Sequence, residues 1–227
     1  MTSKPRYKEL HDANYQKMKT AGVTGWGGDQ VPDREKRWLE FWQRKHDHPD
    51  FPKNGKVLEL GSGAGNISPI IQNFGYHITG LEISPTAVEM ARDRNKGNPN
   101  IQHFEGSILD LSRFQDQAFD IVFDGLCVHC IIGEDRNNVF QEVLRVLKPR
   151  GHFLLNSICN DPRSPEVLNT FDFKTRCASL DGIPYRYIPK SDDLLAEAVR
   201  HGFNLVESTL IPMFDGDTIE IWLRNLN

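Results

Sequence analysis

Three glycines at every second position follow an apolar stretch and could form a loop that cradles a ligand. The stretch ends at Leu60, and the glycines are Gly61, Gly63 and Gly65. Because glycine has no side chain, the main chain of such a loop can approach a ligand closely. Apolar residues at helical spacing after the loop predict a helix whose free N–H groups point at the same place. The pattern predicts a strand, a glycine loop and a helix that form a nucleotide-type pocket.

The glycine spacing and one carboxylate distinguish two kinds of nucleotide. A dinucleotide fingerprint, G-x-G-x-x-G, would need a glycine at position 66, where this sequence has Asn66. Glu59 lies at the end of the predicted strand, where it would repel a pyrophosphate and attract the amino group of an amino-acid-bearing cofactor. We therefore expect the pocket to bind a cationic group.

A second carboxylate, Glu82, stands at the carboxyl end of the next predicted strand, residues 77–81. A carboxylate in this position beside a glycine loop can accept both hydroxyls of a ribose. Ser84 and Pro85 then predict an N-cap and the first position of a new helix. The alternative is that Glu82 is a solvated residue of that helix cap.

The chain resembles the class I S-adenosylmethionine-dependent methyltransferases from about residue 56 to residue 224. The resemblance rests on the order and separation of Glu59-Leu60-Gly61-Ser62-Gly63-Ala64-Gly65, Glu82, Phe119-Asp120-Ile121-Val122-Phe123-Asp124 and Leu147-Lys148-Pro149-Arg150-Gly151. It implies S-adenosylmethionine as cofactor and S-adenosylhomocysteine as product. It also implies an α/β fold of three layers, α/β/α and Rossmann-like, with a seven-stranded, mostly parallel sheet whose last strand is antiparallel. A closing hairpin, predicted from strands at 203–210 and 218–223, agrees with that sheet.

The resemblance also assigns the cofactor-binding residues. These are Glu59, Gly61, Gly63, Gly65, Glu82, Ile83, Ser107, Ile108 and Asp124. The family commonly has an acidic residue where Ser107 stands, to receive the adenine amino group, and the next residue offers a backbone N–H to the ring. A serine hydroxyl can accept the same hydrogen bond without a charge. Asp110 is either a substitute for that acidic residue or the cap of a turn before Leu111.

The segment after the predicted strand 119–123 is where substrate should meet cofactor, at the carboxyl edge of the sheet. His129 is our candidate general base, because its ordinary pKa suits proton removal near neutral pH. Cys127 and Cys130 flank it, and Cys159 ends the next strand, so a metal site is conceivable. The spacing gives no second paired motif, and we expect no metal and interpret these cysteines as small apolar residues.

Composition argues against several classes of partner. The 227 residues include 27 basic and 31 acidic ones, for a net charge of −4, and no dense basic stripe is evident. We therefore expect no nucleic-acid partner. No apolar run approaches ~18 residues, and the N-terminus has no signal-peptide pattern, so we expect no membrane association and a cytoplasmic location. Four cysteines do not make a disulfide scaffold.

Two regions are predicted. Residues 1–52 form an N-terminal helical cap, with helices at 8–20 and 33–45 joined by a glycine-rich loop that carries Trp26. The resemblance implies that this segment covers the cofactor, so Trp26 is expected to be a further cofactor-binding residue that acts, with Tyr15, as a lid. Residues 53–227 form the methyltransferase domain, in which 159–184 is expected to be an irregular insertion lining the substrate pocket. Ser191 is expected to cap the helix that follows.

The predicted function is methyl transfer from S-adenosylmethionine to a small molecule by in-line displacement in a lidded pocket. Such chemistry asks mainly for a nucleophile held close, aligned and desolvated. The alternatives are a methyltransferase acting on a protein, an NAD-dependent oxidoreductase, and an inactive scaffold with the same fold. The acceptor, the methylated atom and the oligomeric state are left open by the sequence.

Overall fold

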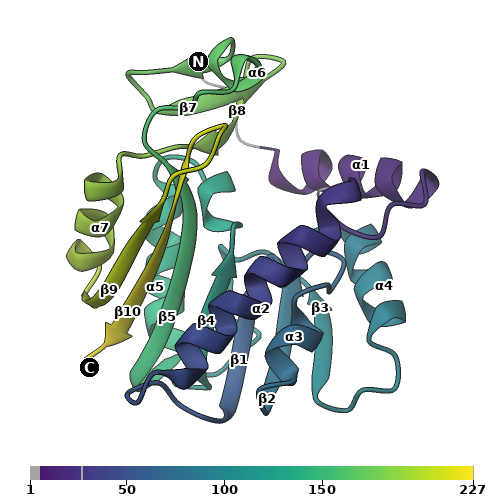
Figure 1. Ribbon diagram of the computed structural model, residues 1–227, viewed down its shortest axis with the longest axis vertical. Helices are drawn as coiled ribbons and strands as arrows, with labels where there is room; N and C mark the ends of the chain where they lie inside the picture. The colour runs from purple at the N-terminus through teal and green to yellow at the C-terminus, as the bar shows by residue number, and fades with distance from the viewer. Residues whose placement is uncertain (1–5, 27, 227) are drawn as a thin grey trace. The chain divides into compact units, whose positions relative to one another are not determined.

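A computed structural model describes residues 6–26 and 28–226 of the chain. Its main sheet has seven strands in the order β3-β2-β1-β4-β5-β10-β9 (Figure 1). The bounds are Gly55–Leu60 for β1, Tyr76–Glu82 for β2, Ile101–Glu105 for β3, Phe119–Gly125 for β4, Leu147–Cys159 for β5, Phe203–Ile211 for β9 and Asp217–Asn225 for β10. The last strand, β10, is antiparallel to both β5 and β9. The predicted seven-stranded sheet with an antiparallel final strand is confirmed.

The described residues form seven helices, of which the first two lie within two residues of the predicted helices at 8–20 and 33–45, whereas the short helix at 165–168 was not predicted. They are α1 (Tyr7–Thr20), α2 (Val31–Asp47), α3 (Ser68–Gln72), α4 (Pro85–Arg94), α5 (Asp135–Val146), α6 (Pro165–Leu168) and α7 (Ser191–Arg200), with 3-10 turns η1 (Gly28–Gln30) and η2 (Val128–Cys130). The longer helices follow apolar periodicity: α5 buries Val139, Phe140, Val143 and Val146. Across residues 6–26 and 28–226, no helix combines the length and apolar character needed to cross a bilayer.

The chain folds into two compact units. We call residues 8–108 with 119–121 the N-terminal unit, and residues 6–7 with 109–118 and 122–226 the C-terminal unit. Each is described separately below.

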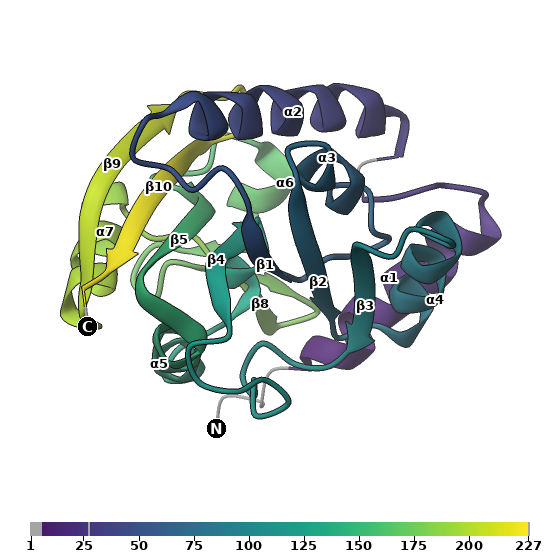
Figure 2. The same ribbon diagram turned by 90° about the horizontal axis from the view of Figure 1, so that it is seen from below.

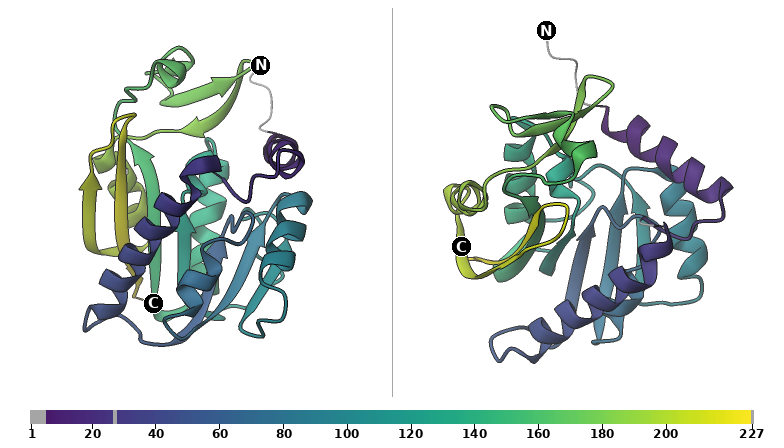
Figure 3. Two further views of the ribbon diagram at one scale, coloured as in Figure 1. Left: turned by 45° about the vertical axis from the view of Figure 1, so that its right-hand side comes forward. Right: turned by 45° about the horizontal axis from the view of Figure 1, so that its top comes forward.

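The N-terminal unit is built on parallel pairing of β1 with β2 and of β2 with β3. Figure 2 shows α3 between α2 and β2, and α4 beside β3. The buried rings of Phe41 and Trp42 on α2 pack with Phe51 and Tyr76, with Trp42 and Tyr76 centroids 5.6 Å apart. Helix α1 lies alongside α4 (Figure 3). These contacts position the ends of β1, β2 and β3 and the loops that follow them.

The C-terminal unit packs α5 and α7 with β5, β9 and β10. Phe140 of α5 contacts Phe153 and Phe203 at ring distances of 6.3 and 6.4 Å. His152 and Trp222 are a buried polar pair on adjacent strands, in which Trp222 Nε1 donates to His152 Nδ1 at 2.8 Å. This pairing satisfies the indole N–H inside the core.

The insertion differs from its prediction as an irregular segment. After α6, the chain forms a second sheet of three strands, β6 (Phe171–Asp172), β7 (Cys177–Leu180) and β8 (Ile183–Tyr187). Its own apolar cluster contains Phe171, Ala178 and Ile188. Asp181 and Gly182 both have positive φ, 51° and 75°, between the paired residues Leu180 and Ile183. An Asp-Gly hairpin turn therefore organises a segment that we expected to lack strands.

Residues 147–151, one of the motifs that carry the resemblance, form the start of β5, in which Arg150 has φ of +64°. One smaller prediction was wrong. Ser191 was expected to be an N-cap, but the cap position is Lys190. The Ser191 N–H instead donates to Asn160 Oδ1 at 3.1 Å, so the cap comes from a residue distant in sequence.

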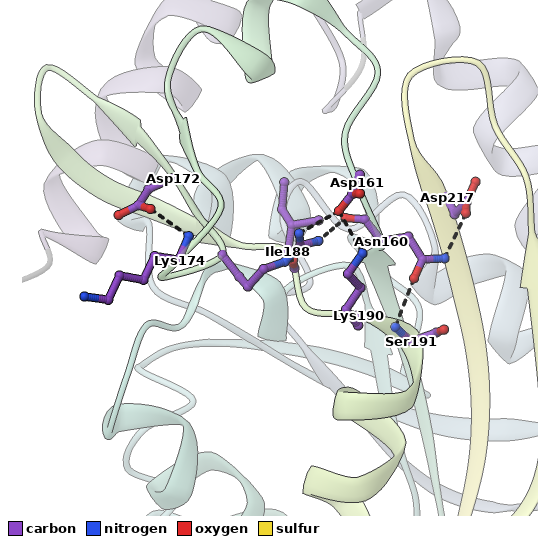
Figure 4. A network of polar contacts seen from close by, with 9 residues as sticks. Asn160, Asp161, Asp172, Lys174, Ile188, Lys190, Ser191 and Asp217 are labelled. Carbon is purple, nitrogen blue, oxygen red and sulfur yellow. Dashed lines mark hydrogen bonds and ion pairs between the residues drawn. The ribbon is translucent and has the colours of Figure 1, made fainter.

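Asn160 connects four segments of the C-terminal unit (Figure 4). Its Nδ2 donates to Asp217 Oδ2 at 2.9 Å, and its N–H donates to the Pro189 carbonyl at 2.8 Å. The neighbouring Asp161 accepts from Arg176 Nη1 at 2.6 Å and from Lys190 Nζ at 3.1 Å. Asn160 itself has φ of +62°, which asparagine tolerates better than most residues.

We expect Asn160→Ala to lower the free energy of unfolding by about 2–4 kcal/mol, since it removes a helix cap and a bond to a carboxylate and leaves alanine at positive φ. Urea unfolding would measure the change. Asn160→Gly is the control, because glycine removes the same side-chain bonds without backbone strain. An alanine variant as stable as wild type would contradict this role.

Candidate functional site

The glycine loop requires glycine for its backbone and for its packing. Gly61, Gly63 and Gly65 have φ of 62°, 54° and 71°. A Cβ added to Gly63 would collide with the hydroxyl of Tyr15, and one added to Gly65 would lie 2.6 Å from Asn95 Nδ2. The loop is therefore a tight turn in which positive φ disfavours side chains at all three glycines and close contacts leave no room for them at Gly63 and Gly65.

Side chains from α4 and β3 hold the loop in place. Asn95 Nδ2 donates to the Gly65 carbonyl at 3.2 Å, and Arg94 Nε donates to the Ala64 carbonyl at 2.9 Å. Buried His103 lies 3.2 Å from Ser62 Oγ and 3.1 Å from Asn95 Nδ2. Burial, with Arg92 nearby, lowers the pKa of His103 to about 4, so the ring is neutral at physiological pH. No sequence pattern identified Asn95 or His103, because both act through contacts with distant segments.

Glu82 is buried and joins the loop to the start of α4. Its Oε2 accepts from the Gly63 N–H at 3.0 Å, and its Oε1 accepts from the Ser84 N–H at 2.9 Å. Burial raises the pKa of this carboxyl group. The alternative of a solvated cap residue is not what the structure shows, since Glu82 is only 5% exposed. The cap itself is Ser84, whose Oγ accepts from the Ala87 N–H at 3.1 Å as predicted.

Glu59 is also buried, at the end of β1. Its Oε2 accepts from Ser68 Oγ at 2.5 Å, and burial raises its pKa to about 8. A carboxyl group in such a place loses its hydration and would be stabilised in its charged form by a neighbouring cation.

The predicted lid residues lie beside the loop within the N-terminal unit. Tyr15 of α1 is buried and packs with Ala64 and Ala87. The ring of Trp26 lies 5.8 Å from that of Tyr15, and Trp26 is 37% exposed. Gly27, part of the predicted lid loop, lies outside the described residues.

A further residue of α1, which the sequence did not single out, fixes the helix to α4. Asp12 Oδ1 accepts from Ser84 Oγ at 2.7 Å and from the Thr86 N–H at 3.1 Å. Helix α1 therefore contacts Ser84, the residue whose backbone N–H donates to Glu82.

The remaining cofactor-binding candidates of this unit lie near the ends of β2 and β3. Ile83 and Ser107 are half-buried, and Ile108 is buried. The Gly106 N–H donates to the Glu82 carbonyl at 2.9 Å, which brings this turn next to Glu82. Asp110 belongs to the C-terminal unit, where its Oδ1 accepts from the Ser112 N–H at 2.9 Å. This contact favours the turn-cap interpretation of Asp110.

In the C-terminal unit, the Asp124 carboxylate accepts hydrogen bonds from backbone N–H groups of the turn that follows it. Its Oδ1 accepts from Cys127 N at 2.7 Å and from Val128 N at 3.0 Å. The side chain is fully buried, and burial raises its pKa to about 7. His129 follows in η2 and is buried, with 5% of its surface exposed and Nε2 3.5 Å from Cys130 Sγ.

The cysteines form no recognisable metal site. Cys127 and Cys130 are half-buried, and Cys159 and Cys177 are buried, all with free thiols. In the part of the chain that the structure describes, no group of three or more histidine, cysteine, aspartate or glutamate side chains could hold a metal ion.

Known proteins are similar to this chain in sequence. Residues 58–155 match the family model described as a methyltransferase domain. The phosphoethanolamine N-methyltransferase of Plasmodium falciparum is 32% identical over 111 residues, 48% of this chain and 41% of that enzyme. The human EEF1A lysine methyltransferase 2 is 29% identical over 180 residues, 74% of this chain and 72% of that one. The chain thus spans less than half the length of the plasmodial enzyme.

A solved structure has the same fold. The Burkholderia thailandensis 1,6-didemethyltoxoflavin-N1-methyltransferase, with bound 1,6-didemethyltoxoflavin and S-adenosylhomocysteine, superposes with a TM-score of 0.67 at 15% identity, covering 100% of this chain and 94% of that one. Sheet order, glycine loop and antiparallel final strand define a Rossmann-like methyltransferase fold. The chain therefore has the fold of the class I S-adenosylmethionine-dependent methyltransferases, and its residues 58–155 are similar to a methyltransferase domain.

We expect Gly65→Ala to lower the free energy of unfolding by more than Gly97→Ala does. Both glycines have positive φ, 71° and 83°, but a Cβ at Gly65 would also lie 2.9 Å from the Ala91 Cβ, whereas nothing lies within 4 Å at Gly97. The Gly97 variant therefore measures backbone strain alone, about 1–2 kcal/mol. Equal losses in urea unfolding would show that the contacts of the loop with α4 are unimportant.

Proposed function

We propose that this protein transfers a methyl group from S-adenosylmethionine to a small-molecule acceptor. The observation that carries the proposal is that the buried carboxylate of Glu82 accepts a hydrogen bond from the Gly63 N–H. Gly63 belongs to a loop in which a Cβ at Gly63 or Gly65 would collide with neighbouring side chains. A neutral ribose offers two hydroxyl donors to such a carboxylate, and the loop leaves main-chain groups close to the ligand.

The chain's own residues would bind and orient the cofactor. Glu82 would accept the ribose hydroxyls, Glu59 would attract the amino group, and the turn at Ser107 and Ile108 would receive the adenine ring. The cofactor supplies a sulfonium-activated methyl group, so the protein needs mainly to align the acceptor and exclude water. His129 is the proposed general base.

A small acceptor is supported by the position of α1. Tyr15 of α1 lies against the glycine loop, the ring of Trp26 packs beside Tyr15, and Asp12 anchors α1 on α4. Such a cover would exclude water from a compact substrate. Unchanged cofactor affinity and turnover in Trp26→Ala would contradict the lid.

A protein acceptor is the second candidate, because the human lysine methyltransferase is similar over 74% of this chain. Transfer of radiolabelled methyl groups to protein, in place of small molecules, would favour it. The net charge of −4 supports our proposal that the protein has no nucleic-acid partner.

Calorimetric titration with S-adenosylmethionine, S-adenosylhomocysteine and NADH tests the proposed function. We expect both adenosyl compounds to bind in the micromolar range, about −8 kcal/mol, and NADH not to bind. Glu82→Ala should weaken their binding at least tenfold. Glu105→Ala is the matched control, since Glu105 pairs with Lys8 on the exposed surface. Absence of adenosyl binding would overturn the proposal and favour a scaffold.

Cofactor binding should release protons from Glu59. With a pKa of about 8 in the free protein, Glu59 is mostly protonated at pH 6.5, and a cationic amino group would lower that pKa and expel up to about one proton. Titrations at pH 6.5 in buffers with different ionisation enthalpies would count the protons. The release should fade above pH 9, where the group is already ionised, and should be smaller in Glu59→Gln. The same count in that variant would contradict the assignment.

A further inference from the structure

Two buried oxygen atoms of the C-terminal unit have no hydrogen-bond partner among the described residues. They are Asp124 Oδ2 and Asn156 Oδ1, on side chains that are 0% and 3% exposed. The two residues are neighbours, because Asn156 Nδ2 donates to the Asp124 carbonyl at 2.8 Å. Buried polar atoms in proteins are nearly always satisfied, so these two point to a partner that the chain itself does not supply.

Both atoms are acceptors when Asp124 is ionised, and their orientation is fixed by their partners. Asp124 Oδ1 is held by two backbone N–H groups of the following turn, which leaves Oδ2 on the other side of the carboxylate. The Asn156 amide cannot be reversed, because its oxygen would then face the Asp124 carbonyl oxygen. The missing partner must therefore donate hydrogens.

The cation that acts on Asp124 already has hydrogen-bond partners. Arg136 on α5 acts on Asp124 through its charge. Its Nε and Nη2 donate to Glu197 at 2.8 and 2.7 Å, and its Nη1 donates to the carbonyls of Val128 and Ile131. The guanidinium group thus has fixed partners on α7 and η2.

We propose that Asp124 and Asn156 bind the N–H groups of the methyl acceptor, and that this acceptor is an amine. The proposal rests on the proposed methyl transfer and names its substrate class. An anionic group would be repelled by Asp124, an ether or ester has no hydrogen to donate, and one hydroxyl group brings a single hydrogen to two acceptors. An amine or ammonium group brings two or more. Asp124, assigned by resemblance to the cofactor, becomes a residue that selects the acceptor.

Carboxyl-carbon NMR of protein labelled with ¹³C at its aspartates tests this binding directly. Ethylammonium chloride is the probe, with ethanol, sodium acetate and sodium chloride at matched concentrations, in protein saturated with S-adenosylhomocysteine. The Asp124 signal is identified by its loss in Asp124→Asn. We expect ethylammonium to shift this signal and to lower its titration midpoint, which burial places near pH 7, by one unit or more.

Two variants sharpen the test. Asn156→Ala should reduce the ethylammonium response at least threefold. Asp116→Asn should not change it, because Asp116 is an exposed aspartate that pairs with Arg145. An Asp124 signal that ignores ethylammonium, or that responds equally to ethanol, would overturn the proposal and leave only water at the two oxygens.

Calorimetry with S-adenosylhomocysteine on the same samples separates the two proposals. If the adenosyl compound binds and the amine does not, the acceptor inference fails and the proposed function stands. If the adenosyl compound does not bind, the proposed function fails, and the NMR titration of the free protein still decides whether Asp124 and Asn156 take an amine.

Discussion

The burial of Glu82 is the constraint on which the N-terminal unit depends. A carboxylate removed from water is stable only when hydrogen bonds replace its hydration, and here the N–H groups of Gly63 and Ser84 do so. Those two bonds fix the glycine loop and the first turn of α4 relative to the end of β2. Asn95 and Arg94 then bind the loop carbonyls from the other end of the same helix. The glycine loop, the end of β2 and the start of α4 are therefore joined into one framework by hydrogen bonds through Glu82. Moving the loop or the helix would leave this buried carboxylate without hydrogen-bond donors.

Helix α1 extends this framework toward the start of the chain. Asp12 binds Ser84 and Thr86 at the first turn of α4, where a negative charge also interacts favourably with the helix dipole. Tyr15 closes over Gly63, which leaves no room there for even a methyl group. The absence of a side chain at position 63 thus serves the packing of α1 as well as the approach of a ligand.

The sequence predicted those parts of the fold that local patterns determine. Alternating glycines, apolar strands and the Ser84-Pro85 helix start each depend on neighbouring residues, and all were found where expected. The missed features depend on contacts between distant residues or on a turn signal overlooked in the insertion. Asn160 caps a helix that begins 31 residues later, and His103 supports the loop across β2 and β3. The Asp181-Gly182 pair is a hairpin-turn signal that could have predicted two of the strands, but the prediction for this insertion used only its length. The unpaired oxygens of Asp124 and Asn156 have no sequence signature at all.

The small sheet β6–β8 differs from the rest of the C-terminal unit in having its own apolar cluster, formed by Phe171, Ala178 and Ile188. A segment that buries its own side chains can accept substitutions at its surface and turns without disturbing the main strands. It is attached through the polar contacts of Asn160 and Asp161 and through one apolar contact with Ile158 of β5. In evolutionary terms, this sheet is a module: selection can remodel it, or laboratory recombination can exchange it between relatives, while the framework around Glu82 stays unchanged.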